Sequence, residues 1–239
     1  MEIYKDIYEL REKLVKDIDK EKIEKILGEV DLKSFPIADN INNEKLNEII
    51  EIVKPSELAS NLIVKHNLKI PENLKDFEEK ILKVLSGKEI DIDEENLLIY
   101  EIILRCYGII YTIIWNVFKN RIDLSKFDKN FCPICGSNFE YGYLDEERRK
   151  FLVCDLCRFP WRYPRIKCPI CGNEDQKKLY YYQFEDDYDF VRVYKCTNCN
   201  QAHKVILLEK LKNYPSVELA NIKTLDFEEV IEDEKNINN

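Results

Sequence analysis

Eight of the nine cysteines in this 239-residue chain form four Cys-x-x-Cys pairs between residues 132 and 199. Two intervening residues let the chain turn back, so that both sulfurs of a pair face one metal ion, about 2.3 Å away if it is zinc. Gly136 and Gly172 follow two of the pairs and Asn200 follows another, where the turn requires a residue that tolerates positive φ. The four pairs are Cys132/Cys135, Cys154/Cys157, Cys168/Cys171 and Cys196/Cys199.

The spacing of the pairs predicts how they combine. Successive pairs are separated by 18, 10 and 24 residues. A separation of 18 is usual within a four-cysteine metal site, whereas 24 is slightly long and 10 is short. We therefore expect the first two pairs to form one site and the last two pairs another, with one metal ion in each. A cage of four thiolates suits zinc or a rubredoxin-like iron, and its closed shell favours a structural role.

The N-terminal residues MEIYKDIYELREK lack the apolar run of a signal peptide, so we expect a cytoplasmic protein. In that reducing compartment, cysteines are more often metal ligands than disulfides. The apolar segment 97–118 is long enough to span a membrane, but Glu101 and Arg105 lie in its middle, where charges are costly in lipid. We expect no membrane span but a buried central helix in which these two residues pair with each other or with a buried polar partner, so that losing one partner costs about 3–5 kcal/mol.

The period of the apolar residues changes near residue 130. Downstream of it, short aromatic and β-branched segments broken by turns indicate strands. Upstream, apolar residues recur at helical spacing within 3–14, 23–27, 46–53, 55–66, 71–87 and 94–118. The chain is therefore predicted to be α+β. We expect an all-α domain at 1–130, two tandem rubredoxin-like or zinc-ribbon β modules at 131–167 and 168–215, and an acidic C-terminal tail at 216–239.

The cysteine series, together with the segment between its second and third pairs, resembles the formate dehydrogenase accessory (maturation) proteins of the FdhE family. Members of that family typically share a CP-x-CGS first turn, a strand that ends in the second pair, a tryptophan, and an R-x-K-C sequence that leads into the third pair. Trp161, Arg165 and Lys167 of this chain stand at the matching positions. The resemblance covers residues 131–226, and its main segments are CPICGS at 132–137, FLVCDLC at 151–157 and RFPWRYPRIKC at 158–168.

The resemblance implies a chaperone-like accessory protein rather than an enzyme. Its partner would be the immature catalytic subunit of a molybdenum- or tungsten-containing formate dehydrogenase in the cytoplasm, bound through the Cys-x-x-Cys motifs. The resemblance also allows iron as the bound metal. The residues themselves agree with a binding role, because nothing in the sequence is arranged as nucleophile, base and oxyanion donors.

We expect the segment 158–167 to dock the partner, because ten residues held between two metal-binding turns lose little entropy on binding. Its candidate contact residues are Trp161, Arg162, Arg165 and Lys167, since tryptophan and arginine often dominate interface energies. In the alternative interpretation, Trp161 packs between the two modules and Arg165 pairs with an acidic residue of the tail.

Two other functions compete with this one. The same segment interleaves arginines with aromatic residues, as in zinc-ribbon modules that bind nucleic acid or other proteins. A net charge of −9 opposes phosphate binding, however, and we expect no nucleic acid partner. A thiol–disulfide oxidoreductase typically has one Cys-x-x-Cys at the start of a helix rather than four in a strand-rich region. Sulfur or metal delivery as a side activity stays an open alternative.

Overall fold

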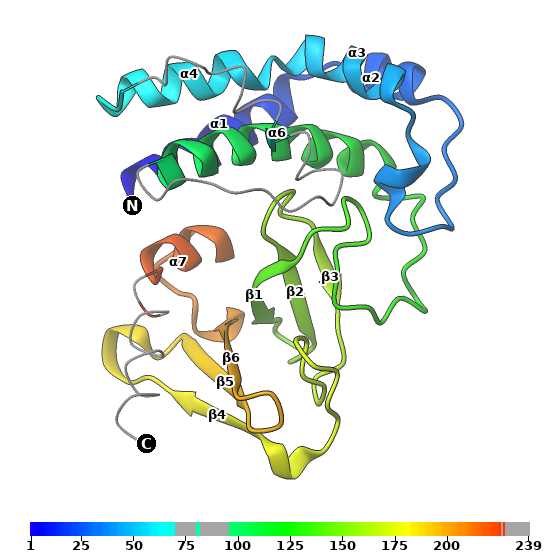
Figure 1. Ribbon diagram of the computed structural model, residues 1–239. Coiled ribbons are helices and arrows are strands. Elements are labelled where there is room, and N and C mark those ends of the chain that lie inside the picture. The colour runs from blue at the N-terminus through cyan, green and yellow to red at the C-terminus, as the bar shows by residue number, and fades with distance from the viewer. Residues whose placement is uncertain (70–79, 82–95, 226, 228–239) are drawn as a thin grey trace. The chain divides into compact units, whose positions relative to one another are not determined.

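The computed structural model describes residues 1–69, 80–81, 96–225 and 227 of the chain. Its internal contacts divide it into two compact units, with the division between Ile122 and Asp123. The first unit is helical, and the second contains a mixed β-sheet and both cysteine clusters (Figure 1). The predicted α+β class is therefore confirmed, while the finer domain bounds stay a prediction.

Short local signals start the helices of the first unit. The side chains of Asp19 and Asn42 each accept a hydrogen bond from a backbone N–H three residues further on and cap α2 and α3. Pro55 opens α4, where its missing N–H costs nothing. The helix predicted at 71–87 lies outside the described residues, apart from 80–81. The elements are α1 Glu2–Asp17, α2 Lys20–Leu27, the 3-10 turn η1 Ile37–Asn40, α3 Asn43–Val53, α4 Pro55–Lys65 and α6 Leu97–Phe118.

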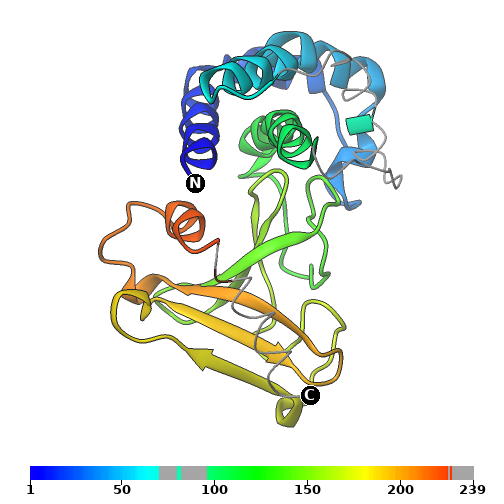
Figure 2. The same cartoon turned by 60° about the vertical axis from the view of Figure 1, so that its left-hand side comes forward.

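Helix α6 forms the core of this unit. It is apolar on nearly all sides, and α1 to α4 pack around it (Figure 2). By length and composition it could cross a membrane, with a mean hydropathy of 1.8, but 72% of the apolar segment is buried inside the protein. Such burial is typical of a core helix. Cys106 lies within α6, where burial raises the pKa of its thiol to about 12, so it is a core residue rather than a nucleophile.

The predicted pairing of Glu101 with Arg105 is confirmed. Arg105 Nε and Nη2 donate to Glu101 Oε1 at 2.9 and 2.8 Å, and the Tyr4 hydroxyl donates to Glu101 Oε2 at 2.7 Å. The Glu101 side chain is nevertheless 36% exposed. The predicted cost of about 3–5 kcal/mol for losing one partner assumes a buried pair, and it is too large for this half-exposed one.

The second unit is built on one six-stranded sheet in the order β3-β2-β1-β6-β5-β4 (Figure 1). Strands β1 to β3 form one antiparallel ribbon and β4 to β6 form another. Strand β3 is short, with three residues. The elements are β1 Phe139–Leu144, β2 Lys150–Cys154, β3 Pro160–Arg162, η3 Gln176–Lys178, β4 Leu179–Gln183, η4 Asp186–Tyr188, β5 Val191–Cys196, β6 Gln201–Leu207 and η5 Leu208–Lys210.

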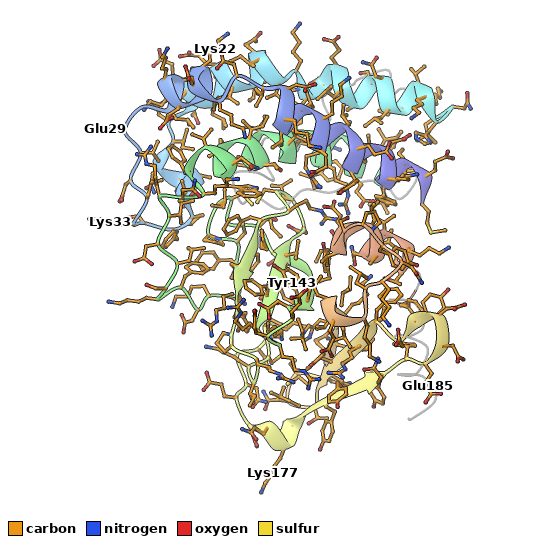
Figure 3. The ribbon with its side chains drawn as sticks, turned by 180° about the vertical axis from the view of Figure 1, so that it is seen from behind. Lys22, Glu29, Lys33, Tyr143, Lys177 and Glu185 are labelled. Carbon is orange, nitrogen blue, oxygen red and sulfur yellow. The ribbon has the colours of Figure 1, made fainter. Side chains whose placement is uncertain are left out.

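A parallel pairing of β1 with β6 joins the two ribbons into one sheet. Tyr143 of β1 aligns with Ile206 of β6. In Figure 3, the labelled Tyr143 marks a central strand and Lys177 the turn before the edge strand β4. The cysteine spacing predicted two modules in tandem but not their union, because a pairing of strands far apart in the sequence leaves no local signal.

Helix α7, Val217–Lys223, covers one face of the sheet. Its Ala220 packs in a buried cluster with Tyr141, Val153 and Ile206, which come from three different strands. Part of the segment predicted as an acidic tail is therefore a packed element of the sheet unit.

Candidate metal centre

The first cysteine cluster is assembled by two turns of the first ribbon. Cys132 and Cys135 lie in the turn before β1, while Cys154 ends β2 and Cys157 follows in the next turn. The Sγ atoms of Cys132 and Cys157 are 3.5 Å apart, and those of Cys135 and Cys154 are 3.4 Å apart. All four sulfurs lie within 4.8 Å of one another.

The second cluster repeats this arrangement in the second ribbon. Cys168 and Cys171 lie in the turn before η3, Cys196 ends β5, and Cys199 lies in the turn to β6. The Sγ atoms of Cys168 and Cys199 are 3.8 Å apart, as are those of Cys171 and Cys196. These two groups are the ones that the spacing predicts. That each group binds a metal ion stays a prediction.

The turns have the backbone geometry that thiolate ligands need. Gly136, Gly172 and Asn200 adopt φ values of 78°, 73° and 54°, in the region expected for them from the sequence. The backbone N–H of Ile134 lies 3.4 Å from Cys132 Sγ. Such N–H donors favour the thiolate over the thiol, because they stabilise negative charge on sulfur.

The donor set of each cluster fits one tetrahedral metal ion. Four sulfurs at about 2.3 Å from an ion lie about 3.8 Å from one another, close to the separations above. Burial, and then the neighbouring sulfurs, raise the pKa of the Cys157 thiol well above its usual value. A bound cation removes this penalty, because a coordinating thiol is deprotonated. Each cluster could therefore hold one ion, and the cage suits zinc and iron alike.

The two clusters differ in their exposure to solvent. Three of the four cysteines of the first cluster are 0% exposed. In the second, Cys171 is exposed and Cys199 is half-buried. A hydrogen bond from the backbone N–H of Asn173 lowers the pKa of the Cys171 thiol to about 6. One edge of the second cluster is thus accessible from outside.

Trp161 is a core residue of the sheet unit. It is 1% exposed, and its Nε1 donates to the backbone carbonyl of Lys129 at 3.1 Å. The prediction that Trp161 anchors a partner is therefore corrected, because its ring is covered and offers no surface for contact. Packing of the tryptophan, the alternative interpretation of the sequence, describes its position.

The other predicted contact residues lie nearer the surface. Arg162 and Arg165 are exposed. Lys167 is half-buried, with its Nζ 3.4 Å from a carboxylate oxygen of Glu174 and 3.7 Å from one of Asp128. Two exposed charges and one partly neutralised charge thus remain in this segment as candidate contacts.

Arg158 connects the first cluster to α7. Its side chain is 7% exposed, its Nε donates to Glu218 Oε1 at 3.0 Å, and its two Nη atoms donate to Glu140. The sequence suggested a pairing of the tail with Arg165, but Arg158 makes it. The available signal was its position directly after the second pair, where it adopts φ 60° as the glycines do in their turns.

Several curated proteins with similar sequences are named FdhE or FdhE homologue, although no family model matches the chain. An FdhE homologue from Aquifex aeolicus is 31% identical over 144 residues, which are 58% of this chain and 50% of that protein. One from Stutzerimonas stutzeri is 30% identical over 135 residues, or 53% and 43% of the two chains. The FdhE protein of Escherichia coli is 28% identical over 85 residues, or 34% and 27%. The matched region spans half or less of these relatives' length.

The crystal structure of the FdhE protein from Pseudomonas aeruginosa resembles this structure over most of both chains. The match has a TM-score of 0.59 at 17% identity and covers 97% of this chain and 83% of the other. At this identity the likeness shows a shared fold. It supplements the sequence matches, which are concentrated in part of the chain. In its sequence and in its fold, the chain is similar to FdhE proteins.

Proposed function

We propose that this chain is a cytoplasmic accessory protein required for the maturation and activity of formate dehydrogenase, and that it is not itself an enzyme. Its client is the immature catalytic subunit of that dehydrogenase, which it binds through the sheet unit. The observation that carries the proposal is the combination of similarity to FdhE proteins with two closed four-cysteine clusters on one sheet.

The chemistry of the described residues supports a binding role. A closed shell of four sulfurs leaves no coordination position for a substrate, so each ion, zinc or iron, would stabilise the turns around it. The two histidines contact Asp6 and Lys150 rather than a candidate nucleophile. In the part of the chain that the structure describes, we find no arrangement of nucleophile, base and oxyanion donors.

The segment that follows β3 is suited to docking. Its first residue, Tyr163, is buried, and it donates from its N–H to the carbonyl oxygen of Lys150 at 2.9 Å and from its hydroxyl to that of Cys168 at 3.4 Å. These contacts fix the backbone that presents Arg162 and Arg165 to solvent. A preorganised segment loses little entropy on binding, and its arginines favour an acidic surface on the client.

Nucleic acid binding has less support in the structure than in the sequence. Arg158 is enclosed by two carboxylates, and the aromatic rings of Trp161 and Tyr163 are buried. Segment 158–167 therefore offers bases no exposed stack of aromatic and basic residues. The net charge of −9 also opposes binding along the phosphate backbone of a nucleic acid. We therefore retain binding of a protein client as the proposed function.

Co-purification of the catalytic subunit tests the proposal. The tagged full-length chain is expressed with the formate dehydrogenase catalytic subunit, and recovery of the subunit is compared between the wild type and Arg162→Glu/Arg165→Glu. Because both arginines are exposed, the variant should keep its metal content and melting temperature. It should lose most of the client and restore little formate oxidation in a strain without the accessory protein.

The matched control is Lys177→Glu/Lys212→Glu, which reverses two other exposed positive charges of the sheet unit. This variant should recover the client as the wild type does. Equal recovery with both double variants would place the docking surface elsewhere on the chain. Failure of the wild-type chain to recover the subunit, with both metal ions bound, would contradict the proposed function itself.

A further inference from the structure

A pocket of about 390 Å³ opens on the face of the sheet opposite α7. Tyr181, Tyr194 and His203 are neighbours across β4, β5 and β6, so their side chains share this face. The volume lies within the range of roughly 300–1,000 Å³ that is typical of small-molecule sites. The residues that carry the argument are Lys150, Arg165, Tyr181, Tyr194, Lys195 and His203.

Lys150 places a buried cation in the wall of this pocket. It is 2% exposed, its Nζ lies 3.0 Å from His203 Nε2, and it stands over the rings of Tyr163 and Tyr194 at 5.7 and 5.5 Å from their centroids. Among the described residues, no carboxylate oxygen lies within 4.0 Å of this Nζ. Burial lowers the pKa of Lys150 to about 8, so most of it is still charged at pH 7.

The ammonium group of Lys150 has hydrogen-bonding capacity to spare. It carries three N–H donors, and His203 accepts one of them. Burial and then the neighbouring Lys150 lower the pKa of His203 well below its usual value, so the neutral ring accepts this bond. A buried cation without an anionic partner is unfavourable, and an incoming anion would relieve that cost.

Other positively charged side chains and an exposed aromatic ring lie around the Lys150 ammonium group. Arg165 and Lys195 line the pocket, and neither has a carboxylate oxygen within 4.0 Å in the described part of the chain. Lys167 also lines it, but two acidic side chains already offset its charge. The exposed ring of Tyr181 forms part of the wall. A positive, aromatic pocket in a chain with a net charge of −9 is not a consequence of composition.

The second cysteine cluster is the rival partner for Lys150. Cys168 and Cys196 line the same pocket, and four thiolates around a divalent ion carry excess negative charge. Attraction through space to that cluster would explain the position of the ammonium group without any ligand. It would not explain the aromatic wall or the open volume.

We propose that this pocket binds a small molecule in which a carboxylate or phosphate group is attached to a planar ring. Lys150 donates to the oxyanion, Arg165 and Lys195 attract it, and the ring lies against Tyr181 and Tyr194. His203 is a positioning residue that orients the ammonium group. This inference concerns a ligand of the chain alone and does not depend on the proposed client.

Calorimetric titration of the metal-loaded full chain tests the proposal. The probes are phenyl phosphate and inorganic phosphate, with phenol as the uncharged control. Phenyl phosphate should bind about tenfold more tightly than inorganic phosphate, and phenol should not bind, because both the ring and the charge contribute. Lys150→Met keeps the aliphatic stem and removes the charge, and it should weaken phenyl phosphate binding by about tenfold or more.

Lys204→Met is the matched control. Lys204 is equally buried in the same sheet, but it faces α7 and donates to the backbone carbonyls of Asn221 and Thr224. Its replacement should lower the melting temperature and leave probe affinity unchanged. Lys195→Gln, at a less buried position of the pocket, should weaken binding several-fold, so the test survives if a buried-lysine variant does not fold.

Three results would overturn the proposal. The first is equal affinity of the wild type and Lys150→Met for phenyl phosphate. The second is loss of the metal ion of the second cluster from Lys150→Met without any change in probe affinity, which would assign the lysine to that cluster. The third is binding of an acidic peptide where phenyl phosphate does not bind, which would assign the pocket to a protein surface.

Discussion

The two cysteine clusters begin with the same four residues, Cys-Pro-Ile-Cys, but lie in different surroundings. In the first, Ile134 is 0% exposed, and Leu156 and Phe159 beside the second pair are also buried. In the second, Ile170 is 39% exposed and Cys171 reaches the surface. Ligand spacing thus determines which four sulfurs meet but not how far solvent reaches them, because segments from elsewhere in the chain provide the cover.

This difference suggests that the two clusters have different roles in the same sheet. The first cluster lies among core side chains and is tied to α7 through Arg158. An ion bound there would chiefly stabilise the fold. The second cluster has an accessible edge, so an ion bound there would be the more open to exchange.

The largest expected effect comes from removing ligands of the first cluster. In Cys132→Ser/Cys135→Ser, one ion should be lost and the sheet unit should unfold. A structural zinc site contributes about 10–16 kcal/mol, as much as the whole stability of a typical domain. Elemental analysis and circular dichroism of the purified variant measure both changes.

The corresponding variant of the second cluster is Cys168→Ser/Cys171→Ser. It should also lose one ion, but it should retain the other ion and a folded first ribbon, because the buried core of that ribbon stays intact. If this variant unfolds as completely as the first one, the two clusters are equivalent and the proposed difference in their roles is wrong.

Chelation of the wild-type protein sharpens the same comparison. A chelator can approach the sulfur of Cys171 directly, whereas attack on the first cluster has to wait for local opening. The second ion should therefore leave on the order of tenfold faster. Release is followed by absorbance of the chelate, and Cys168→Ser/Cys171→Ser should lack the fast phase. A single phase that releases both ions would remove the distinction.

Two arginines of the same segment provide a smaller contrast. Arg158→Ala removes the cation that the partly buried carboxylates of Glu140 and Glu218 both contact, and it should cost about 3–5 kcal/mol in the free energy of unfolding. Arg165→Ala changes an exposed side chain and should stay within about 0.5 kcal/mol. Urea denaturation measures both values. Similar costs for the two variants would mean that the burial assigned to Arg158 is wrong.

The smallest effect is expected in the helical unit. Glu101→Gln removes the charge that Arg105 and Tyr4 contact, and since Glu101 is 36% exposed, we expect a cost of about 1–2 kcal/mol. Thermal denaturation measures the cost, and the metal content should not change. An unaltered melting temperature would show that the pair contributes nothing to packing around α6.

The sequence predicted the secondary-structure elements better than the way in which they pack against one another. Helical periodicity located α1 to α4 and α6, and the cysteine spacing grouped the eight sulfurs, because these signals act over a few residues. The parallel pairing of β1 with β6 was missed, because its two partners lie far apart in the sequence.

Side-chain roles within the segment after the second pair were harder to predict. Trp161 and Arg158 have the residue types of interface anchors, but the sheet buries one and two carboxylates enclose the other. Residue type determines how much free energy a contact can contribute. The fold determines whether the side chain makes that contact inside the protein or at its surface. The sequence did not single out Lys150 for the same reason, because the burial of a single lysine in a strand cannot be predicted from its residue type.

The central claim is that the chain holds two metal ions, each bound by four cysteine sulfurs. Elemental analysis of anaerobically purified protein, combined with X-ray absorption at the metal edge, tests this most directly. We expect two ions per chain, each with four sulfur ligands, at about 2.3 Å if the ion is zinc. One ion or fewer per chain, oxygen or nitrogen in the coordination shell, or a disulfide among the eight cysteines in fresh reduced protein would contradict it.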